Sequence, residues 1–110
     1  MHSATLDIPH GQVMIGGKPY RLTPYEGALL HVLRQAKGQF VRAEDLSFKM
    51  KQAKIELGLR GHPLDAELIS WWHVSCLRRK LGRELMDNLI EHRLGWGYRW
   101  KGSDGTEGMS

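Results

Sequence analysis

The chain has 110 residues, which is enough for one domain with one hydrophobic core and too few for a second domain of ordinary size. Hydrophobic residues make up 41% of the chain and charged residues 25%, a balance that excludes a disordered protein. The formal net charge of +4 favours polyanionic partners.

The first predicted element is a small antiparallel sheet. Apolar and polar residues alternate from Thr5 to Arg21, and glycines at 11, 16 and 17 interrupt the alternation. A period of two with glycine breaks is typical of short strands joined by tight turns.

A helix is predicted from Pro24 to Lys37. Thr23 is a suitable N-cap, Pro24 suits the first helical position, and Glu26 completes a capping box with Thr23. Gly38 stands where a C-terminal cap belongs.

Two further helices follow. The second ends near Gly58, and its apolar face holds Leu46, Met50, Ala53 and Leu57. A turn is predicted at 61–63 and a third helix over about 65–81, with Gly82 as its stop. The buried stripe of that third helix is predicted at Val74, Leu77 and Leu81.

The last element is a β-hairpin over about 89–100, with a glycine-bearing turn at 95–97. The small, polar residues 102–110 are predicted to be a disordered tail. The fold class is therefore α+β: residues 1–101 form one domain with an N-terminal antiparallel sheet, three helices and a C-terminal hairpin.

The third helix carries most of the local positive charge. Opposite its buried stripe, the helical period places Trp72, Ser75, Cys76, Arg79 and Arg83, flanked by His73, Lys80 and Arg78. A basic helix fits the major groove of DNA, although cations at a helix C-terminus also complement the helix dipole and are often merely solvated. This cluster and the charge balance leave both interpretations open.

Five sequence blocks, in order, cover roughly residues 6–101. They are LTPYE at 22–26 with Leu29 and Leu30, GQFV at 38–41, Glu44 with Leu46, LRRKLG at 77–82 and GWGYR at 95–99. Together they resemble the DNA-binding effector domain of OmpR/PhoB-type bacterial response regulators, a winged helix-turn-helix.

The resemblance implies a DNA-binding site, with the third helix in the major groove and the hairpin as a wing on the backbone or minor groove. Trp72, His73, Ser75, Cys76 and Arg79 fall on or near positions that face DNA, Arg78 on a phosphate-binding arginine, and His92, Arg93 and Tyr98 on the wing. Arg79 is the best candidate for a base contact, ideally bidentate to guanine.

The chain also departs from this family. Cys76 stands where a basic residue is common, Trp71 where an acidic residue is common, and Leu94 where the wing often has an arginine. Arg42 replaces the usual serine cap of the second helix. Family members normally carry a phosphoacceptor receiver domain, which these residues do not contain, so we expect control by abundance, dimerisation or a partner rather than by aspartyl phosphorylation.

The tryptophans have alternative roles. Trp71 lies nearer the buried stripe and is expected in the core, whereas Trp72 contacts either a thymine methyl and sugar or a protein partner. Trp96 and Trp100 are expected to pack in the hairpin, with Trp100 closing the sheet.

Neither an enzyme nor a cofactor is expected. His73 and Cys76 have no third orienting group, the single cysteine excludes an internal disulfide, and the six histidines lack metal-ligand spacing. With no apolar run of roughly 18 residues and no signal-peptide pattern at the start, we expect a cytoplasmic location and no membrane partner.

The sequence thus predicts a bacterial transcriptional regulator that binds specific double-stranded DNA sequences, with a homodimer on repeated half-sites as one possible assembly. The alternative is a winged-helix module that binds RNA polymerase or another regulator, which Trp72, Cys76 and Leu94 favour because each is apolar or soft at a usually polar position.

Overall fold

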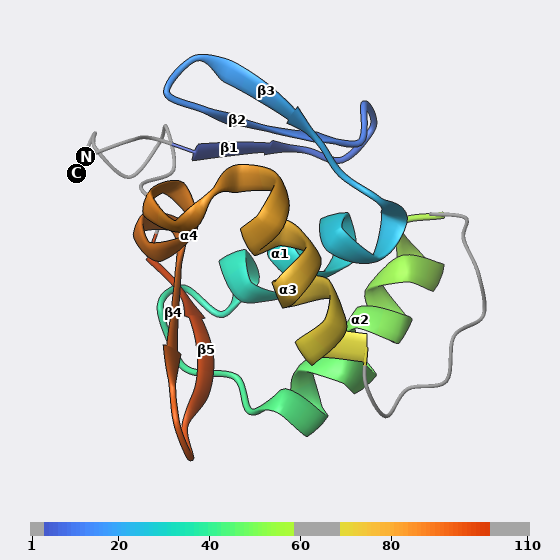
Figure 1. Ribbon diagram of the computed structural model, residues 1–110. Coiled ribbons are helices and arrows are strands. Elements are labelled where there is room, and N and C mark those ends of the chain that lie inside the picture. Colours follow the sequence, from blue (N-terminus) through green and yellow to red (C-terminus); the bar gives the residue numbers. More distant parts are fainter. Residues whose placement is uncertain (1–3, 59–68, 102–110) are drawn as a thin grey trace.

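The computed structural model describes residues 4–58 and 69–101. Along the chain, an N-terminal sheet is followed by the helices, which form most of the core, and then by a C-terminal hairpin (Figure 1). In chain order they are β1 (Ala4–Asp7), β2 (Gln12–Ile15), β3 (Lys18–Arg21), α1 (Pro24–Gln35), α2 (Ala43–Glu56), α3 (Ile69–Leu81), α4 (Arg83–Leu89), β4 (Ile90–Arg93) and β5 (Gly97–Trp100). The predicted turn at 61–63, the start of the third helix and the predicted tail at 102–110 lie outside the described residues.

The N-terminal sheet is confirmed. It has the order β1-β2-β3, and both pairs are antiparallel. Its inward residues alternate with exposed ones, so Ala4, Leu6, Val13 and Ile15 are buried in the core. The sheet covers one end of the molecule, whereas the tip of the hairpin points away from the opposite end (Figure 1).

Helix α1 is the centre of the core. Its predicted start is confirmed, because the Thr23 hydroxyl accepts from the Glu26 amide and the Glu26 carboxylate accepts from the Thr23 amide. Its buried residues Leu29, Leu30 and Leu33 pack against buried residues of α2, α3 and β5. Among the described residues, no helix combines the length and apolarity that crossing a bilayer requires.

A fourth helix, α4, was not predicted. Gly82 ends α3 as expected, with a φ of 87°, but the chain then turns directly into the seven residues of α4. Met86 and Leu89 of this helix are buried. A helix this short gives too little periodicity to separate it from a loop by sequence.

The hairpin β4–β5 with its turn, residues 90–100, is the wing. It is attached to the chain just before α2 by two backbone hydrogen bonds: the Val41 amide donates to the Tyr98 carbonyl at 2.7 Å, and the Tyr98 amide donates to the Val41 carbonyl at 2.9 Å. A Cβ at Gly97 would lie 2.1 Å from the Val41 oxygen, so this attachment requires glycine there.

Candidate nucleic-acid interface

Helix α3 turns one face inward, as its sequence predicts. Val74, Leu77 and Leu81 are all buried in the core. In Figure 1, α3 lies across α1 between α2 and the wing. The opposite side of α3 is therefore the side that a ligand can reach.

The beginning of α3 is fixed to α2 by buried serines. The Ser47 hydroxyl donates to the Ser70 hydroxyl at 2.9 Å, the Ser70 hydroxyl donates to the Ala43 carbonyl at 3.2 Å, and the Ser70 amide donates to Ser47 Oγ at 3.3 Å. Because these polar groups satisfy one another away from water, they hold α2 and α3 in one relative position. Sequence reasoning missed this pair, since two serines 23 residues apart give no signal.

The end of α3 is fixed to α1 by an ion pair. Lys80 Nζ lies 2.6 Å from Oε1 of Glu26, which is 1% exposed and also accepts from the Thr23 amide. The Lys80 side chain is 32% exposed, but its ammonium is directed to this carboxylate. The structure therefore gives Lys80 a structural role, in place of the predicted position on the basic face.

His73 is not on the exposed face, so that prediction is wrong. The residue is 6% exposed, and its ring stacks on Tyr25 of α1 with centroids 4.9 Å apart. Its buried Nε2 has no hydrogen-bond partner among the described residues. Burial lowers the pKa of His73, while the nearby Glu26 carboxylate opposes that shift.

The outer face of α3 consists of the residues that the core leaves outside: Trp71, Trp72, Ser75, Cys76, Arg78 and Arg79. The prediction that Trp72 is exposed is confirmed at 49%, but the prediction that Trp71 lies in the core is wrong, because it is 59% exposed. Ser70 and His73 are buried instead, so the buried side of α3 is turned away from Trp71. Ser75 and Cys76 are half-buried, and both arginines are exposed.

Arg83 does not belong to this face. The sequence interpretation placed Arg83 on this face by the helical period, although it also ended the third helix at Gly82; in the structure Arg83 is the first residue of α4, after the chain changes direction. The exposed positive charge on α3 therefore comes from Arg78 and Arg79. Neither forms an ion pair with a carboxylate in residues 4–58 and 69–101.

The arginines of the wing share one carboxylate. Glu91 accepts from Arg99 Nε at 2.6 Å and from Arg93 at 3.1 Å. Chiefly through the Arg99 hydrogen bond, these contacts lower the pKa of Glu91. Both guanidinium groups also lie over the ring of Phe40, at 5.3 Å for Arg93 and 5.1 Å for Arg99. The wing therefore offers less free positive charge than its sequence indicates.

The aromatic residues of the wing divide differently from the prediction. Tyr98, expected at the DNA contact, is buried and stacks with the exposed His92 at 4.5 Å between centroids, so its side chain is structural. Burial raises its pKa, against the nearby charge of Arg78. Trp100 is buried as expected, but Trp96 is exposed and meets the edge of Phe40.

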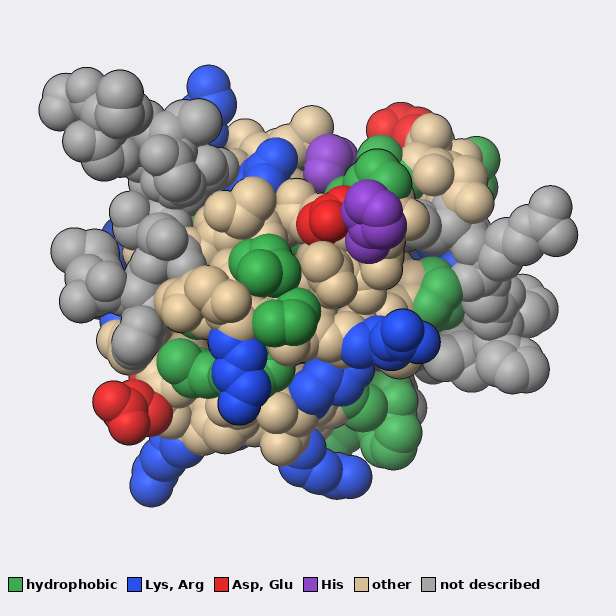
Figure 2. Space-filling view, turned by 90° about the horizontal axis from the view of Figure 1, so that it is seen from above, with side chains coloured by type: hydrophobic (Ala, Val, Ile, Leu, Met, Phe, Trp, Pro, Cys, Tyr) green, Lys and Arg blue, Asp and Glu red, His purple; other side chains and the backbone are tan. Residues whose placement is uncertain are grey.

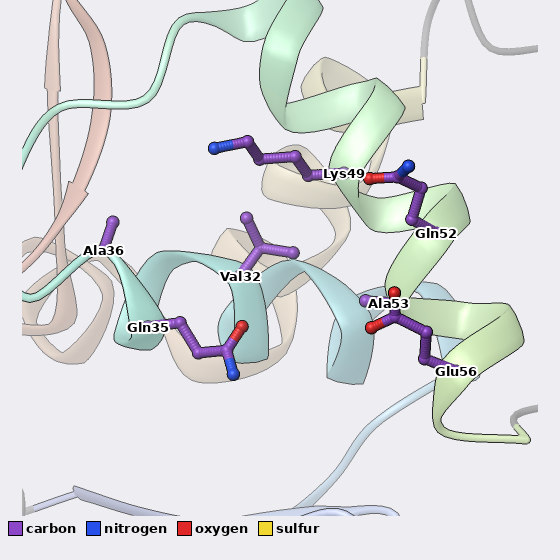
Figure 3. Close-up of a pocket in the computed structure, with 7 residues that line it drawn as sticks. All are labelled: Val32, Gln35, Ala36, Lys49, Gln52, Ala53 and Glu56. Carbon is purple, nitrogen blue, oxygen red and sulfur yellow. The ribbon is translucent and has the colours of Figure 1, made fainter.

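Among the grooves of the described residues, two are lined by residues of α2. One, of about 260 Å³, runs between α1 and α2 and is lined by Val32, Gln35, Ala36, Lys49, Gln52, Ala53 and Glu56 (Figure 3). Its lining brings no nucleophile and base together in the way that covalent catalysis requires. The other, of about 200 Å³, lies between the start of α2 and the wing, with Arg42, His92 and Leu94 in its wall.

Solved structures of known proteins share this architecture. No protein-family model and no curated protein matches the chain. Among solved structures, the DNA-binding domain of CpxR from E. coli is 31% identical, with 89% of each chain covered and a TM-score of 0.59. The DNA-binding domain of the response regulator AdeR, solved in complex with an intercistronic region, is 18% identical, covers 91% of this chain and 95% of its own, and has a TM-score of 0.64. With a fixed helix, a wing and this degree of likeness to CpxR, the chain belongs to the OmpR/PhoB-type family of winged-helix DNA-binding domains.

Proposed function

We propose that this chain is a transcriptional regulator that binds specific double-stranded DNA sequences, with α3 in the major groove and the wing on the backbone or minor groove. The observation that carries the proposal is the outer face of α3. It presents Arg78 and Arg79 without a described carboxylate partner, on a helix whose two ends are fixed by Ser47–Ser70 and Glu26–Lys80. Because such a helix is already held in place, its side chains can reach base edges without the entropic cost of ordering the helix on binding.

Each exposed residue then has a role. Arg79 is the candidate for a bidentate contact with guanine, and Arg78 is the candidate for a phosphate contact. Ser75 and Cys76 lie between the tryptophans and the arginines on the same face. On the wing, the exposed His92 and Arg93 are the candidates for backbone or minor-groove contacts.

The test is an unbiased selection of bound duplexes at two salt concentrations, followed by affinity measurements on Arg79→Ala. We expect that substitution to cost about 1 to 3 kcal/mol at its cognate base and to relax specificity there. Arg21→Ala is the matched control, since Arg21 is exposed on β3 at the sheet end. That end carries Lys and Arg side chains scattered among other residues, so one charge lost there should change affinity little (Figure 2).

Failure has a clear form. Unchanged affinity of Arg79→Ala for the selected site would contradict the role of Arg79, and absence of any duplex retention at low salt would contradict DNA binding itself. The selection also reports whether repeated half-sites are enriched, which tests a homodimer on DNA.

A second candidate function is binding to RNA polymerase or another regulator. Leu94, 91% exposed, and Trp96 favour it because both lie at the turn of the wing beside the smaller groove. Purified RNA polymerase is the probe. Retention that survives nuclease treatment and is lost in Leu94→Asp would support this function.

A further inference from the structure

We infer that the outer face of α3 recognises thymine through the indole rings of Trp71 and Trp72. This inference rests on the proposed function and extends it to the class of base that α3 reads. It starts from two large aromatic side chains at neighbouring positions on the reading helix, both about half exposed or more. In the same turns of α3, the side chains buried in the core are Ser70 and His73, not the tryptophans.

The two rings have no aromatic or cationic partner in residues 4–58 and 69–101. Neither Trp71 nor Trp72 stacks with another described aromatic ring or lies under a described cation. Trp96, also exposed, differs because it meets Phe40 and the guanidinium of Arg93. About half of each indole is therefore an apolar surface that the described part of the chain leaves uncovered.

The positive charge on the same face of α3 indicates which kind of partner binds the two tryptophans. Arg78 and Arg79 follow Trp71 and Trp72 by two turns, so a partner that contacts both pairs must combine negative charge with apolar groups. The major groove of a duplex has phosphates along its walls and thymine methyl groups on its floor. A duplex therefore complements the whole face, charge included.

The indole group selects among the bases by its chemistry. Its Nε1–H is a donor only, and its remaining surface is apolar. In the major groove, thymine presents a methyl group next to the O4 acceptor, whereas cytosine presents the N4 amino donor. An indole can thus contact the thymine methyl group and donate a hydrogen bond to O4. Opposite cytosine, the indole N–H would face the N4 amino group, and two donors cannot form a hydrogen bond. Guanine, with two acceptors and no methyl, is left to Arg79.

The test uses the unaltered protein first, so that folding of a variant is not at issue. Each thymine of the selected duplex is replaced in turn by deoxyuridine, which removes only the methyl group. We expect affinity to fall about fourfold at one or two adjacent positions, as for one buried methyl-sized group. A change of the same base pair to cytosine should weaken binding further, because it also removes the O4 acceptor.

Protein variants then assign the effect. The difference between thymine and uracil should disappear in Trp71→Ala or Trp72→Ala and persist in Trp96→Ala, the exposed tryptophan outside α3. If uracil is tolerated at every position of a duplex that is bound specifically, the inference is overturned and the proposed function stands. Persistence of the difference in both α3 variants also overturns it. Absence of duplex retention overturns the proposed function, and the inference with it.

Discussion

Replacing Lys80 with alanine separates the structural cations of α3 from its DNA-binding cations. Lys80 and Arg79 are neighbours in a basic run, and the sequence assigns both to the same surface. In the structure, the Lys80 ammonium lies 2.6 Å from the almost fully buried Glu26. Lys80→Ala leaves that carboxylate without its cation. The expected result is a loss of stability rather than a specific loss of DNA affinity.

The magnitude follows from burial. Removing one partner of a fully buried ion pair costs about 3 to 5 kcal/mol. Lys80 is about one-third exposed, and Glu26 keeps its hydrogen bonds at the start of α1, so we expect about 2 kcal/mol. For a domain of this size, that corresponds to a fall in Tm of about 8 °C. Arg79→Ala, an exposed change, should stay within about 0.5 kcal/mol of the parent.

The stability of Lys80→Ala and Arg79→Ala is compared by urea and thermal denaturation, and their duplex affinity is measured well below either Tm. Adding Glu26→Gln to Lys80→Ala should recover part of the stability, because a neutral amide needs no cation and still accepts the capping hydrogen bond. A Lys80→Ala variant that keeps the parent Tm but loses as much DNA affinity as Arg79→Ala would refute this account.

Three other predictions concern the wing and the core. Gly97→Ala should detach the wing from Val41 and lower stability by more than about 2 kcal/mol, visible as a lower urea midpoint, because its Cβ would collide with the Val41 carbonyl. Stability should fall as pH drops below about 6.5, because burial lowers the pKa of both His73 and His31, so the unfolded state binds these protons before the folded state does. His73→Phe should reduce that slope in thermal melts, and an unchanged slope would refute the contribution of His73. Glu91→Gln should release the two wing arginines and tighten binding to duplex of any sequence, with a steeper salt dependence by about 0.9 per added phosphate contact; equal slopes would show that these arginines do not reach phosphate.

Most of the architecture could be predicted because its signals are local. The capping box at Thr23 and Glu26 and the stripe Val74, Leu77 and Leu81 depend on residues within a few positions of one another. The alternation of the N-terminal strands is equally local. The structure confirms all of these.

The composition of the outer face could not be predicted as well, because it depends on contacts from distant parts of the chain. His73 lies inward since Tyr25 offers it a stacking surface, and Ser70 lies inward since Ser47 and the Ala43 carbonyl satisfy its hydrogen bonds. With those two side chains inside, Trp71 is left outside. A helical wheel drawn from Val74, Leu77 and Leu81 places Ser70 inward, but it leaves His73 and Trp71 at the two edges of the buried side, where contacts with other elements decide which one is buried.

The same distant contacts change what the net charge means for DNA binding. Lys80 is paired with Glu26, and Arg93 and Arg99 share Glu91, so the cations that remain on the proposed DNA face are chiefly Arg78 and Arg79. Even if Arg78, Arg79 and one cation of the wing all contacted phosphate, three contacts would give a log–log salt slope of only about −3. With so small an electrostatic contribution, a duplex must be held largely by contacts that salt does not screen. Trp71 and Trp72, which have no ring or cation partner among the described residues, are the exposed side chains best suited to supply them. A steep salt dependence would instead mean that the paired cations leave their carboxylates when DNA binds.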